Sequence, residues 1–278
     1  MAACCAHADE LSPRPMNERV LVTHDGGVAH VRLNRPDKRN GLDLAMFEAL
    51  LDAGERLSKD RHVRAVVLSG EGPAFCAGLD WKAFLGDPEG SRRLLARDPG
   101  RSPANAAQRA CWVWTEVPVP VVAAVHGVAL GGGLQLALAC DLRLVTPDAQ
   151  LSVMEIRYGL IPDMTASQTL LRLVRPDVAR ELVFTGRAVA GEEAVRLGLA
   201  TRVAADPVAE ALALARTIAA QSPGAIRAGK QLCDRAPGLD VDAALQLETE
   251  LQLGLLGTPH QVEAVQAAMT RRPARFED

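Results

Sequence analysis

Short blocks of apolar residues, separated by turn residues, indicate a chain in which strands alternate with helices. Apolar, β-branched runs predict strands at residues 20–23 and 28–33, which flank Asp25-Gly26-Gly27 as a hairpin. Residues 43–58 have apolar positions at helical spacing behind Asp43, a residue type that caps helices well. Further apolar runs predict strands at residues 63–68, 119–125, 142–145 and 151–153. The pattern therefore predicts an α/β fold.

The pattern changes towards the end of the chain, where helical periodicity replaces strands. Helices are expected from about Thr165 onward, and from Pro207 the pattern is entirely helical. The helices of this last region are predicted at residues 209–220, 223–234, 241–256 and 259–270. We therefore divide the chain into a flexible N-terminal tail at 1–15, an α/β core at 16–205 and a helical region at 206–278.

Composition narrows the class of protein. The chain has 278 residues, 48% hydrophobic and 23% charged, which is enough for a large buried core. Its net charge of -3 gives no general attraction for nucleic acid, and every apolar run is interrupted before it reaches membrane-spanning length. There is no secretory signal pattern, and the six cysteines are scattered, so we expect a cytoplasmic protein. The six histidines form no His-x-x-x-His pair, so we expect no metal site.

The most informative stretch runs from Val125 to Ala137, where three glycines, Gly131 to Gly133, separate an apolar strand from a helix start. Such a turn exposes unpaired backbone N–H groups at the positive end of a helix dipole, where they can bind a phosphate or a developing oxyanion. A P-loop would need Gly-Lys-Ser/Thr, and a dinucleotide site would need a glycine where Leu136 stands. Close packing of the helix on the strand is the simpler alternative.

A second motif, Phe75-Cys76-Ala77-Gly78-Leu79-Asp80, follows another apolar strand. Its presence favours binding of an oxyanion over the other two explanations of the glycine-rich turn. Together, Phe-x-Ala-Gly-x-Asp and His-Gly-x-x-x-Gly-Gly-Gly resemble the paired oxyanion-hole segments of the crotonase superfamily, the enoyl-CoA hydratases and isomerases. The resemblance extends from near Val20 to Phe276. It implies a spiral of repeated ββα units, followed by a C-terminal helical appendage that packs across subunits in a homotrimer or a dimer of trimers. It also implies an acyl-CoA substrate and no cofactor beyond the coenzyme A of that substrate.

The resemblance also assigns binding residues. The two amide donors would be the backbone N–H groups of Leu79 and Gly132, which would bind the thioester oxygen and stabilise an enolate. Losing one such donor typically raises the barrier by about 3 kcal/mol. The segment between Trp81 and Pro118 would form a variable flap over the acyl pocket. Coenzyme A is expected near five residues, of which the first two could instead form an ordinary solvated turn: Lys38, Arg39, Ala77, Leu79 and Trp81.

The acidic residues decide which reaction is favoured. In hydratases of this family two glutamates flank one water, the first three residues after the middle glycine and the second 20 residues further on; here these positions hold Gln135 and Glu155. An amide can orient a water but cannot be a general acid or base, which disfavours hydration. Asp163 follows Glu155 by eight residues, a spacing similar to the dienoyl-CoA isomerases, which however have an aspartate where Gln135 stands. We therefore expect the catalytic group Glu155, Asp163 and Gln135 to isomerise an enoyl- or dienoyl-CoA. An enoyl-CoA hydratase and a non-catalytic CoA-ester-binding protein are the alternatives.

Several of these residues have simpler structural explanations. Asp163 could cap a helix that begins near Thr165, and Asp80 could cap a helix that begins at Trp81. Cys76 lies beside the expected site, but the sequence identifies no histidine partner that would make it a nucleophile. Three basic residues of the helical region could either bind coenzyme A or solvate a helix surface: Lys230, Arg271 and Arg272.

Overall fold

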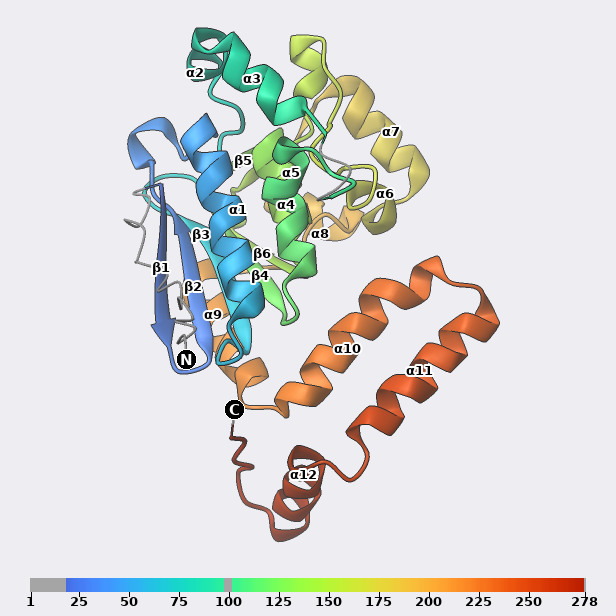
Figure 1. The fold of residues 1–278 in the computed structure, drawn as a ribbon. Coiled ribbons are helices and arrows are strands. Elements are labelled where there is room, and N and C mark those ends of the chain that lie inside the picture. The colour runs from blue at the N-terminus through green and yellow to red at the C-terminus, as the bar shows by residue number, and fades with distance from the viewer. Residues whose placement is uncertain (1–18, 98–101, 278) are drawn as a thin grey trace, which may run out of the picture.

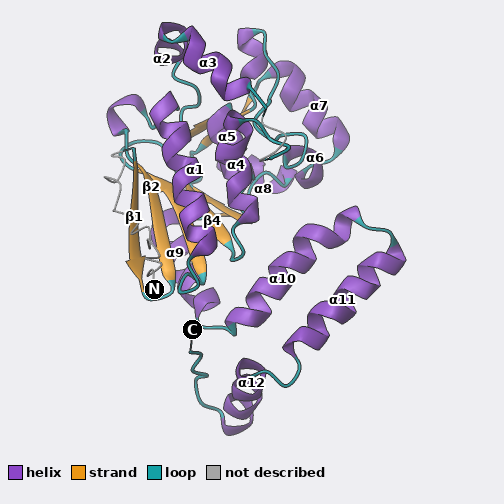
Figure 2. Cartoon of the chain, in the orientation of Figure 1, coloured by secondary structure: helices purple, strands orange, loops and turns teal. Residues whose placement is uncertain are grey.

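A six-stranded sheet forms the centre of the molecule (Figures 1 and 2). The computed structural model describes residues 19–97 and 102–277, so the tail predicted at 1–15 lies outside the described residues. In spatial order the strands are β1 (Val20–Asp25), β2 (Val28–Leu33), β3 (Ala65–Gly70), β4 (Val121–Val125), β6 (Leu142–Val145) and β9 (Arg202–Val203). β1 and β2 pair antiparallel, and all other neighbours are parallel. The predicted hairpin and the α/β fold are confirmed.

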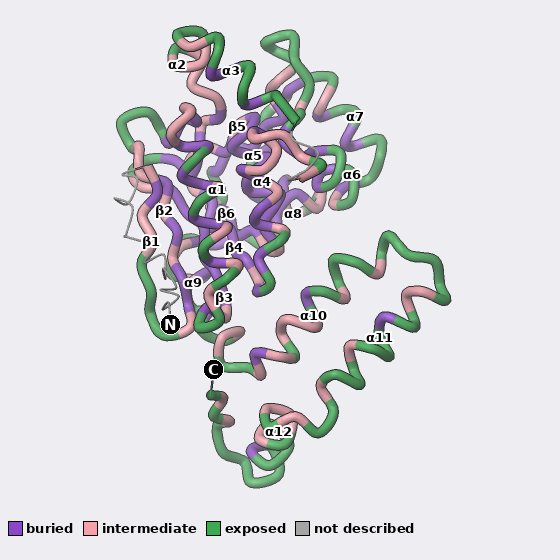
Figure 3. Tube along the Cα trace, in the orientation of Figure 1, coloured by how far each residue is buried: buried purple, intermediate pink, exposed green. Residues whose placement is uncertain are grey.

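Helices cover both faces of this sheet. One face packs against α1 (Leu44–Lys59) and α4 (Ala106–Glu116), and the other against α9 (Pro207–Ala219). Every residue of β3 and β4 is buried, as expected for parallel strands inside a layered fold. Asp43 caps α1, as predicted, by accepting a hydrogen bond from the N–H of Met46. Figure 3 shows the buried residues concentrated between these layers.

A smaller, three-stranded sheet carries the glycine-rich segment. Its strands are β5 (Val128–Leu130), β7 (Gln150–Ser152) and β8 (Ala188–Ala190). β5 corrects the sequence analysis, which took the chain from the strand ending at Val125 directly into a helix; here β5 comes between that strand and α5 (Gly132–Leu138). Gly127 makes the intervening turn with a φ of +60°, and a Cβ there would lie 2.1 Å from Pro73 O. Both facts require glycine at this position.

Shorter helices lie around these two sheets. In the predicted flap, α2 (Trp81–Gly86) and α3 (Pro88–Leu95) lie above α1 and α5 in Figure 1. Asp80 caps α2, as the sequence suggested, by accepting hydrogen bonds from the N–H groups of Lys82 and Ala83. The other short elements are η1 (Pro36–Lys38), η2 (Glu155–Tyr158), α6 (Leu170–Leu173), α7 (Pro176–Thr185), α8 (Gly191–Leu197) and η3 (Ala236–Gly238).

The C-terminal helices begin and end within two residues of their predicted positions. After α9 they are α10 (Pro223–Arg235), α11 (Val241–Leu255) and α12 (Pro259–Thr270). Figure 1 shows α10 to α12 extending away from the sheet as an arm, whereas α9 packs on the sheet. The division of the chain at residue 206 stays a prediction. Within the described ranges, no helix is both long and apolar enough to cross a membrane.

Candidate active site

The two glycine-containing motifs lie side by side because backbone hydrogen bonds join them. The N–H of Cys76 donates to Val128 O at 3.0 Å, and the N–H of Leu130 donates to Cys76 O at 3.0 Å. These bonds form an isolated parallel bridge between Cys76 and Ala129. The loop after β3 is therefore held against β5, and the two segments that the sequence analysis singled out meet in one place.

Leu79 and Gly132 present backbone N–H groups that are available to a ligand. Leu42 pairs with both neighbours of Leu79: its N–H donates to Gly78 O at 2.8 Å, and its carbonyl accepts from the N–H of Asp80 at 3.0 Å. The N–H of Leu79 therefore points away from Leu42, because successive backbone groups alternate in extended chain. Gly132 is the first residue of α5, so its N–H has no acceptor within the helix. Among the described residues, neither N–H has a backbone acceptor.

Gly78 lets these two loops approach each other. Its φ is +85°, and a Cβ at this position would lie 2.5 Å from Leu130 O and 3.7 Å from Gly132 N. Any side chain would be strained here and would push Leu130 away. Two unpaired N–H groups on adjacent loops have the form of an oxyanion hole. That role of Leu79 and Gly132 stays a prediction.

A cavity of about 290 Å³ opens beside the two donors. It is lined by Leu79 and Gly132 and by all three residues of the expected catalytic group, Gln135, Glu155 and Asp163. Most of its remaining wall is apolar and includes Phe47, Trp81, Phe84, Leu94, Tyr158 and Met164. Such walls lower the local dielectric and strengthen electrostatic interactions inside the cavity.

Glu155 begins η2 and has one unpaired carboxylate oxygen. Its Oε1 accepts a hydrogen bond from Gln135 Nε2 at 2.7 Å. Its Oε2 is buried and has no hydrogen-bond partner among the described residues. Burial raises the pKa of Glu155, and the charge of Asp163 raises this pKa further, against the opposing effect of the hydrogen bonds from its own backbone and Gln135. An unpaired oxygen with a raised pKa is suited to accept a proton.

Gln135 holds Glu155 in place. Gln135 is only 2% exposed. Its Oε1 accepts hydrogen bonds from the N–H groups of Met164 at 2.8 Å and Ala166 at 3.2 Å, while its Nε2 donates to Glu155. Both acceptor positions of the amide oxygen are therefore occupied. The side chain joins α5 to the segment that carries Asp163 and orients the carboxylate of Glu155.

Asp163 lines the cavity and is not a helix cap. No helix begins near Thr165, which has a φ of +83° and opens a series of turns. The next helix, α6, begins at Leu170 and has Thr169 at its N-cap position. The capping alternative for Asp163 is therefore wrong. Burial raises the pKa of Asp163, so two carboxyl groups with raised pKa values line one cavity.

A second hollow, of about 600 Å³, adjoins the cavity, and Gly78 lines both. Arg39 is absent from its lining, although its backbone oxygen accepts a hydrogen bond from the N–H of Ala77 at 2.9 Å. Lys82, which the sequence analysis did not select, does line it. The residues expected near coenzyme A that line this hollow are Lys38, Ala77, Leu79 and Trp81.

Other candidates from the sequence have structural partners. Lys230 Nζ pairs with Asp141 at 2.6 Å, and Arg272 pairs with Glu263 at 2.6 Å, which favours a structural role for these two basic residues within this chain. Cys76 is fully buried, and burial raises the pKa of its thiol to about 12. A thiol with that pKa is protonated near neutral pH, so Cys76 is not suited to be a nucleophile.

Besides Lys82, two residues near the site were missed by sequence reasoning. The Tyr158 ring packs against Trp81, with ring centroids 4.8 Å apart and planes inclined by 37°, so that η2 contacts the flap. The available signal was its position one helical turn after Glu155. The second is Arg35, whose Nη2 pairs with Asp80 Oδ2 at 2.7 Å. Nothing in the spacing distinguished it from the other basic residues of the chain.

Comparisons with known proteins identify the family to which the chain belongs. A family model described as enoyl-CoA hydratase/isomerase matches residues 23–278. The chain is 34% identical over 262 residues to the mitochondrial Delta(3,5)-Delta(2,4)-dienoyl-CoA isomerase of Rattus norvegicus. This match covers 89% of this chain and 78% of that protein. It is 33% identical over 283 residues to the mitochondrial enoyl-CoA hydratase domain-containing protein 2 of Mus musculus, covering 98% of this chain and 92% of that protein.

Solved structures show the same fold. The crystal structure of an enoyl-CoA hydratase from Bacillus anthracis matches with a TM-score of 0.86 at 30% identity, covering 93% of this chain and 98% of that chain. The chain therefore belongs to the enoyl-CoA hydratase/isomerase family of the crotonase superfamily. It is an acyl-CoA enzyme of that superfamily, and the crotonase-like fold with C-terminal helices is confirmed.

Proposed function

We propose that this enzyme moves a double bond along the acyl chain of an enoyl- or dienoyl-CoA. The observation that carries the proposal is the unpaired Oε2 of Glu155, in a cavity that the available N–H groups of Leu79 and Gly132 also line. A base beside a polarised thioester is the arrangement needed to remove a proton from the adjacent carbon. The position that would hold a second glutamate for hydration is instead occupied by Gln135.

The reaction begins when the thioester oxygen accepts hydrogen bonds from Leu79 and Gly132. Glu155, as a carboxylate, removes an α- or γ-proton, and the electron pair of the broken C–H bond delocalises onto the thioester oxygen as an enolate. The two N–H groups bind this oxygen more tightly as its charge grows, and each contributes about 3 kcal/mol to lowering the barrier. The raised pKa of Glu155 favours the transfer because it makes the carboxylate a stronger base.

The second half of the reaction returns one proton to a different carbon. For a single double-bond shift, Glu155 returns the proton that it removed. For a conjugated dienolate, Asp163 donates at the more distant carbon while Glu155 keeps its proton, and the raised pKa of Asp163 favours its protonated form. Before the next turnover Glu155 releases its proton to solvent and Asp163 takes one up. One proton leaves and one is added, so the reaction consumes no water and needs no cofactor besides the coenzyme A of the substrate.

The test is a panel of 2-enoyl-, 3-enoyl- and 3,5-dienoyl-CoA thioesters with detection of products by mass and ultraviolet absorbance. We expect positional isomers of unchanged mass. Products heavier by one water, formed faster than isomers, would identify a hydratase, which the free Oε2 of Glu155 could serve by binding a water. Binding of all the thioesters without conversion would identify a non-catalytic CoA-ester-binding protein.

Coenzyme A is proposed to occupy the hollow beside the cavity. Lys38 and Lys82 line it together with Trp81 and the ion pair of Arg35 and Asp80, so the lining is net positive where phosphate groups would lie. Leu79 lines both the hollow and the cavity, which would let the thioester pass from one to the other. Arg39 is not included, because its side chain does not line the hollow.

The chain is further proposed to form a homotrimer or a dimer of trimers. The support is the arm of α10 to α12, which leaves the core and exposes large apolar side chains. A monomer mass by light scattering would contradict this. The exposed apolar residues of the arm include Val241, Leu245, Leu253, Leu256, Val265 and Met269.

The cytoplasmic location stays a prediction.

Gln135→Glu is expected to raise hydration of a short 2-enoyl-CoA by about tenfold or more, because it supplies a second group that can transfer a proton. One oxygen of the new carboxyl could accept the hydrogen bonds from Met164 and Ala166, and the other would lie beside Glu155 Oε1. Such a pair holds one proton between them near neutral pH. The measurement is the hydration rate of parent and variant. Gln135→Met, which adds no acid, is the control, and a folded Gln135→Glu protein without any gain would contradict the interpretation.

Asp163→Asn is expected to lower turnover of a 3,5-dienoyl-CoA by about a hundredfold and to leave 3-enoyl-CoA turnover nearly unchanged. The melting temperature should stay close to the parent value, because Asp163 caps no helix. Where Asp163 is ionised, its charge raises the pKa of Glu155, and the variant lacks this charge, so the rise of the 3-enoyl rate with pH should begin at lower pH. Exposed Asp148→Asn is the control. Equal loss on both substrates would show that Asp163 is not specific to the dienoyl reaction.

A further inference from the structure

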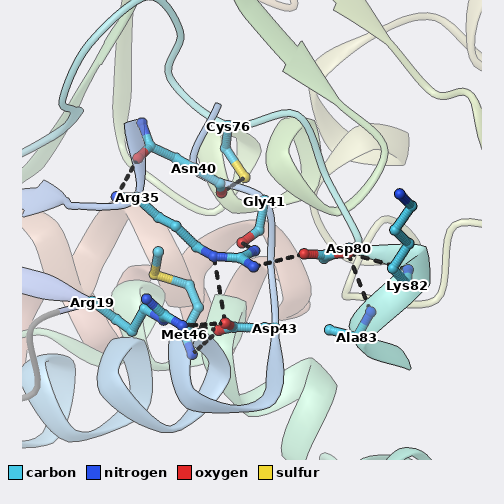
Figure 4. A network of polar contacts seen from close by, with 10 residues as sticks. All are labelled: Arg19, Arg35, Asn40, Gly41, Asp43, Met46, Cys76, Asp80, Lys82 and Ala83. Carbon is cyan, nitrogen blue, oxygen red and sulfur yellow. Dashed lines mark hydrogen bonds and ion pairs between the residues drawn. The ribbon is translucent and has the colours of Figure 1, made fainter. Parts of the chain in front are cut away.

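The guanidinium of Arg35 joins Asp80, the residue after Leu79, to the segment of Gly41 and Asp43, as Figure 4 shows. Its Nη2 lies 2.7 Å from Asp80 Oδ2, and its Nε lies 3.5 Å from Asp43 Oδ2. Its Nη1 donates a hydrogen bond to Gly41 O at 3.0 Å. The side chains of Arg35, Asp80 and Asp43 are 12%, 17% and 11% exposed, so these contacts are only weakly screened by solvent.

Asp80 directly follows Leu79 and has two separate functions. Its Oδ1 caps α2 by accepting hydrogen bonds from the N–H groups of Lys82 at 3.1 Å and Ala83 at 3.2 Å, while its Oδ2 pairs with Arg35. Burial alone would raise the pKa of Asp80, but the hydrogen bonds from Arg35 and from the helix lower it, so the carboxylate is charged near neutral pH. One carboxylate oxygen of Asp80 is thus held by the start of α2 and the other by Arg35, which together restrict the position of its backbone.

We propose that Arg35 is a positioning residue for the oxyanion hole: through its ion pair with Asp80 it holds the N–H of Leu79 in line with the thioester oxygen. This inference rests on the proposed function. The backbone on either side of Leu79 is tied to Leu42, and the side chain of Asp80 adds the only ion pair next to the donor among the described residues. An amide that shifts by a fraction of an ångström stabilises the enolate less, although the ester can still bind.

A different role for Arg35 would be direct binding of coenzyme A, because Arg35 also lines the hollow beside the cavity. Its guanidinium, however, is already engaged by Asp80, Asp43 and Gly41. The two roles predict different kinetics. Loss of a coenzyme A ligand raises KM, whereas loss of alignment at the donor lowers kcat at nearly constant KM.

Two matched variants separate alignment from folding. Asp80→Asn keeps a good capping side chain for α2 but removes the charge that pairs with Arg35. Asp43→Asn likewise keeps the cap of α1 and removes the other carboxylate that contacts Arg35, at a residue not adjacent to Leu79. The assay is exchange of the α-proton of butyryl-CoA in heavy water, which needs the oxyanion hole and Glu155 but no double-bond shift. We expect kcat for Asp80→Asn to fall about tenfold with KM within about twofold, and Asp43→Asn to stay within about twofold of the parent.

The infrared carbonyl band of bound butyryl-CoA, labelled with ¹³C at the thioester carbon, reports the alignment directly. Hydrogen bonds from the oxyanion hole lower this frequency in the parent, and we expect a smaller shift in Asp80→Asn than in Asp43→Asn. An unchanged kcat and band in Asp80→Asn, a rise in KM alone, or equal kcat losses in both variants that follow their melting temperatures would each overturn the inference. A parent that binds butyryl-CoA without exchange or band shift would instead overturn the proposed function, and this inference with it.

Discussion

Glu155→Gln is expected to lower both isomerisation and α-proton exchange by about a hundredfold or more while acyl-CoA binding persists. Glutamine keeps the size of the side chain, and its amide oxygen can still accept the hydrogen bond from Gln135. It cannot accept the substrate proton, which in the parent goes to the unpaired Oε2. The measurements are exchange of butyryl-CoA in heavy water, turnover of 3-enoyl-CoA, and the dissociation constant of a CoA ester by calorimetry.

Stability provides a second readout for the same variant. Burial raises the pKa of Glu155 above its unfolded value, so its contribution to the free energy of unfolding is most favourable below the unfolded pKa and is lost as pH rises through the folded pKa. At neutral pH the ionised side chain opposes folding, and Glu155→Gln should therefore not lower the melting temperature. Exposed Glu192→Gln is the matched control. Intact turnover in Glu155→Gln would show that another residue is the base.

Gly78→Ala is expected to lower α-proton exchange by about a hundredfold or more, because it displaces both amide donors together. The new Cβ would lie 2.5 Å from Leu130 O, and alanine is strained at a φ of +85°. The backbone of Leu130 must move, and Gly132 follows it by two residues. The overlap and the backbone strain each cost about 1–3 kcal/mol of stability, so only protein that is shown to be folded is assayed.

Gly86→Ala is the matched control for Gly78→Ala. Gly86 ends α2, and a Cβ there meets no atom within 4 Å. Its exchange rate and melting temperature should therefore match those of the parent. The decisive comparison is the exchange rate of folded Gly78→Ala protein, verified by circular dichroism, in parallel with the carbonyl band of bound butyryl-CoA. A parent-like rate would mean that the two loops need not lie this close for catalysis.

Much of the fold followed from local patterns. The β1–β2 hairpin, the cap of α1 at Asp43 and the ends of α10 to α12 agree with the sequence because each depends on residues within a few positions. Segments without such local signals were less predictable. β5 is only three residues long, and the turns after Thr165 follow a left-handed residue that helical periodicity does not reveal.

The sequence by itself determined the α/β fold, the paired glycine loops and the spacing of Gln135 and Glu155. These features depend on runs of neighbouring residues, whose periodicity and backbone freedom can be recognised without a structure. Only the tertiary structure decided that Gln135 orients Glu155 and that Asp163 lines the cavity. It also decided that Arg35 forms an ion pair with Asp80, the residue after Leu79. Such contacts join segments far apart along the chain, and their geometry depends on how the sheets, loops and flap pack, which no local pattern encodes.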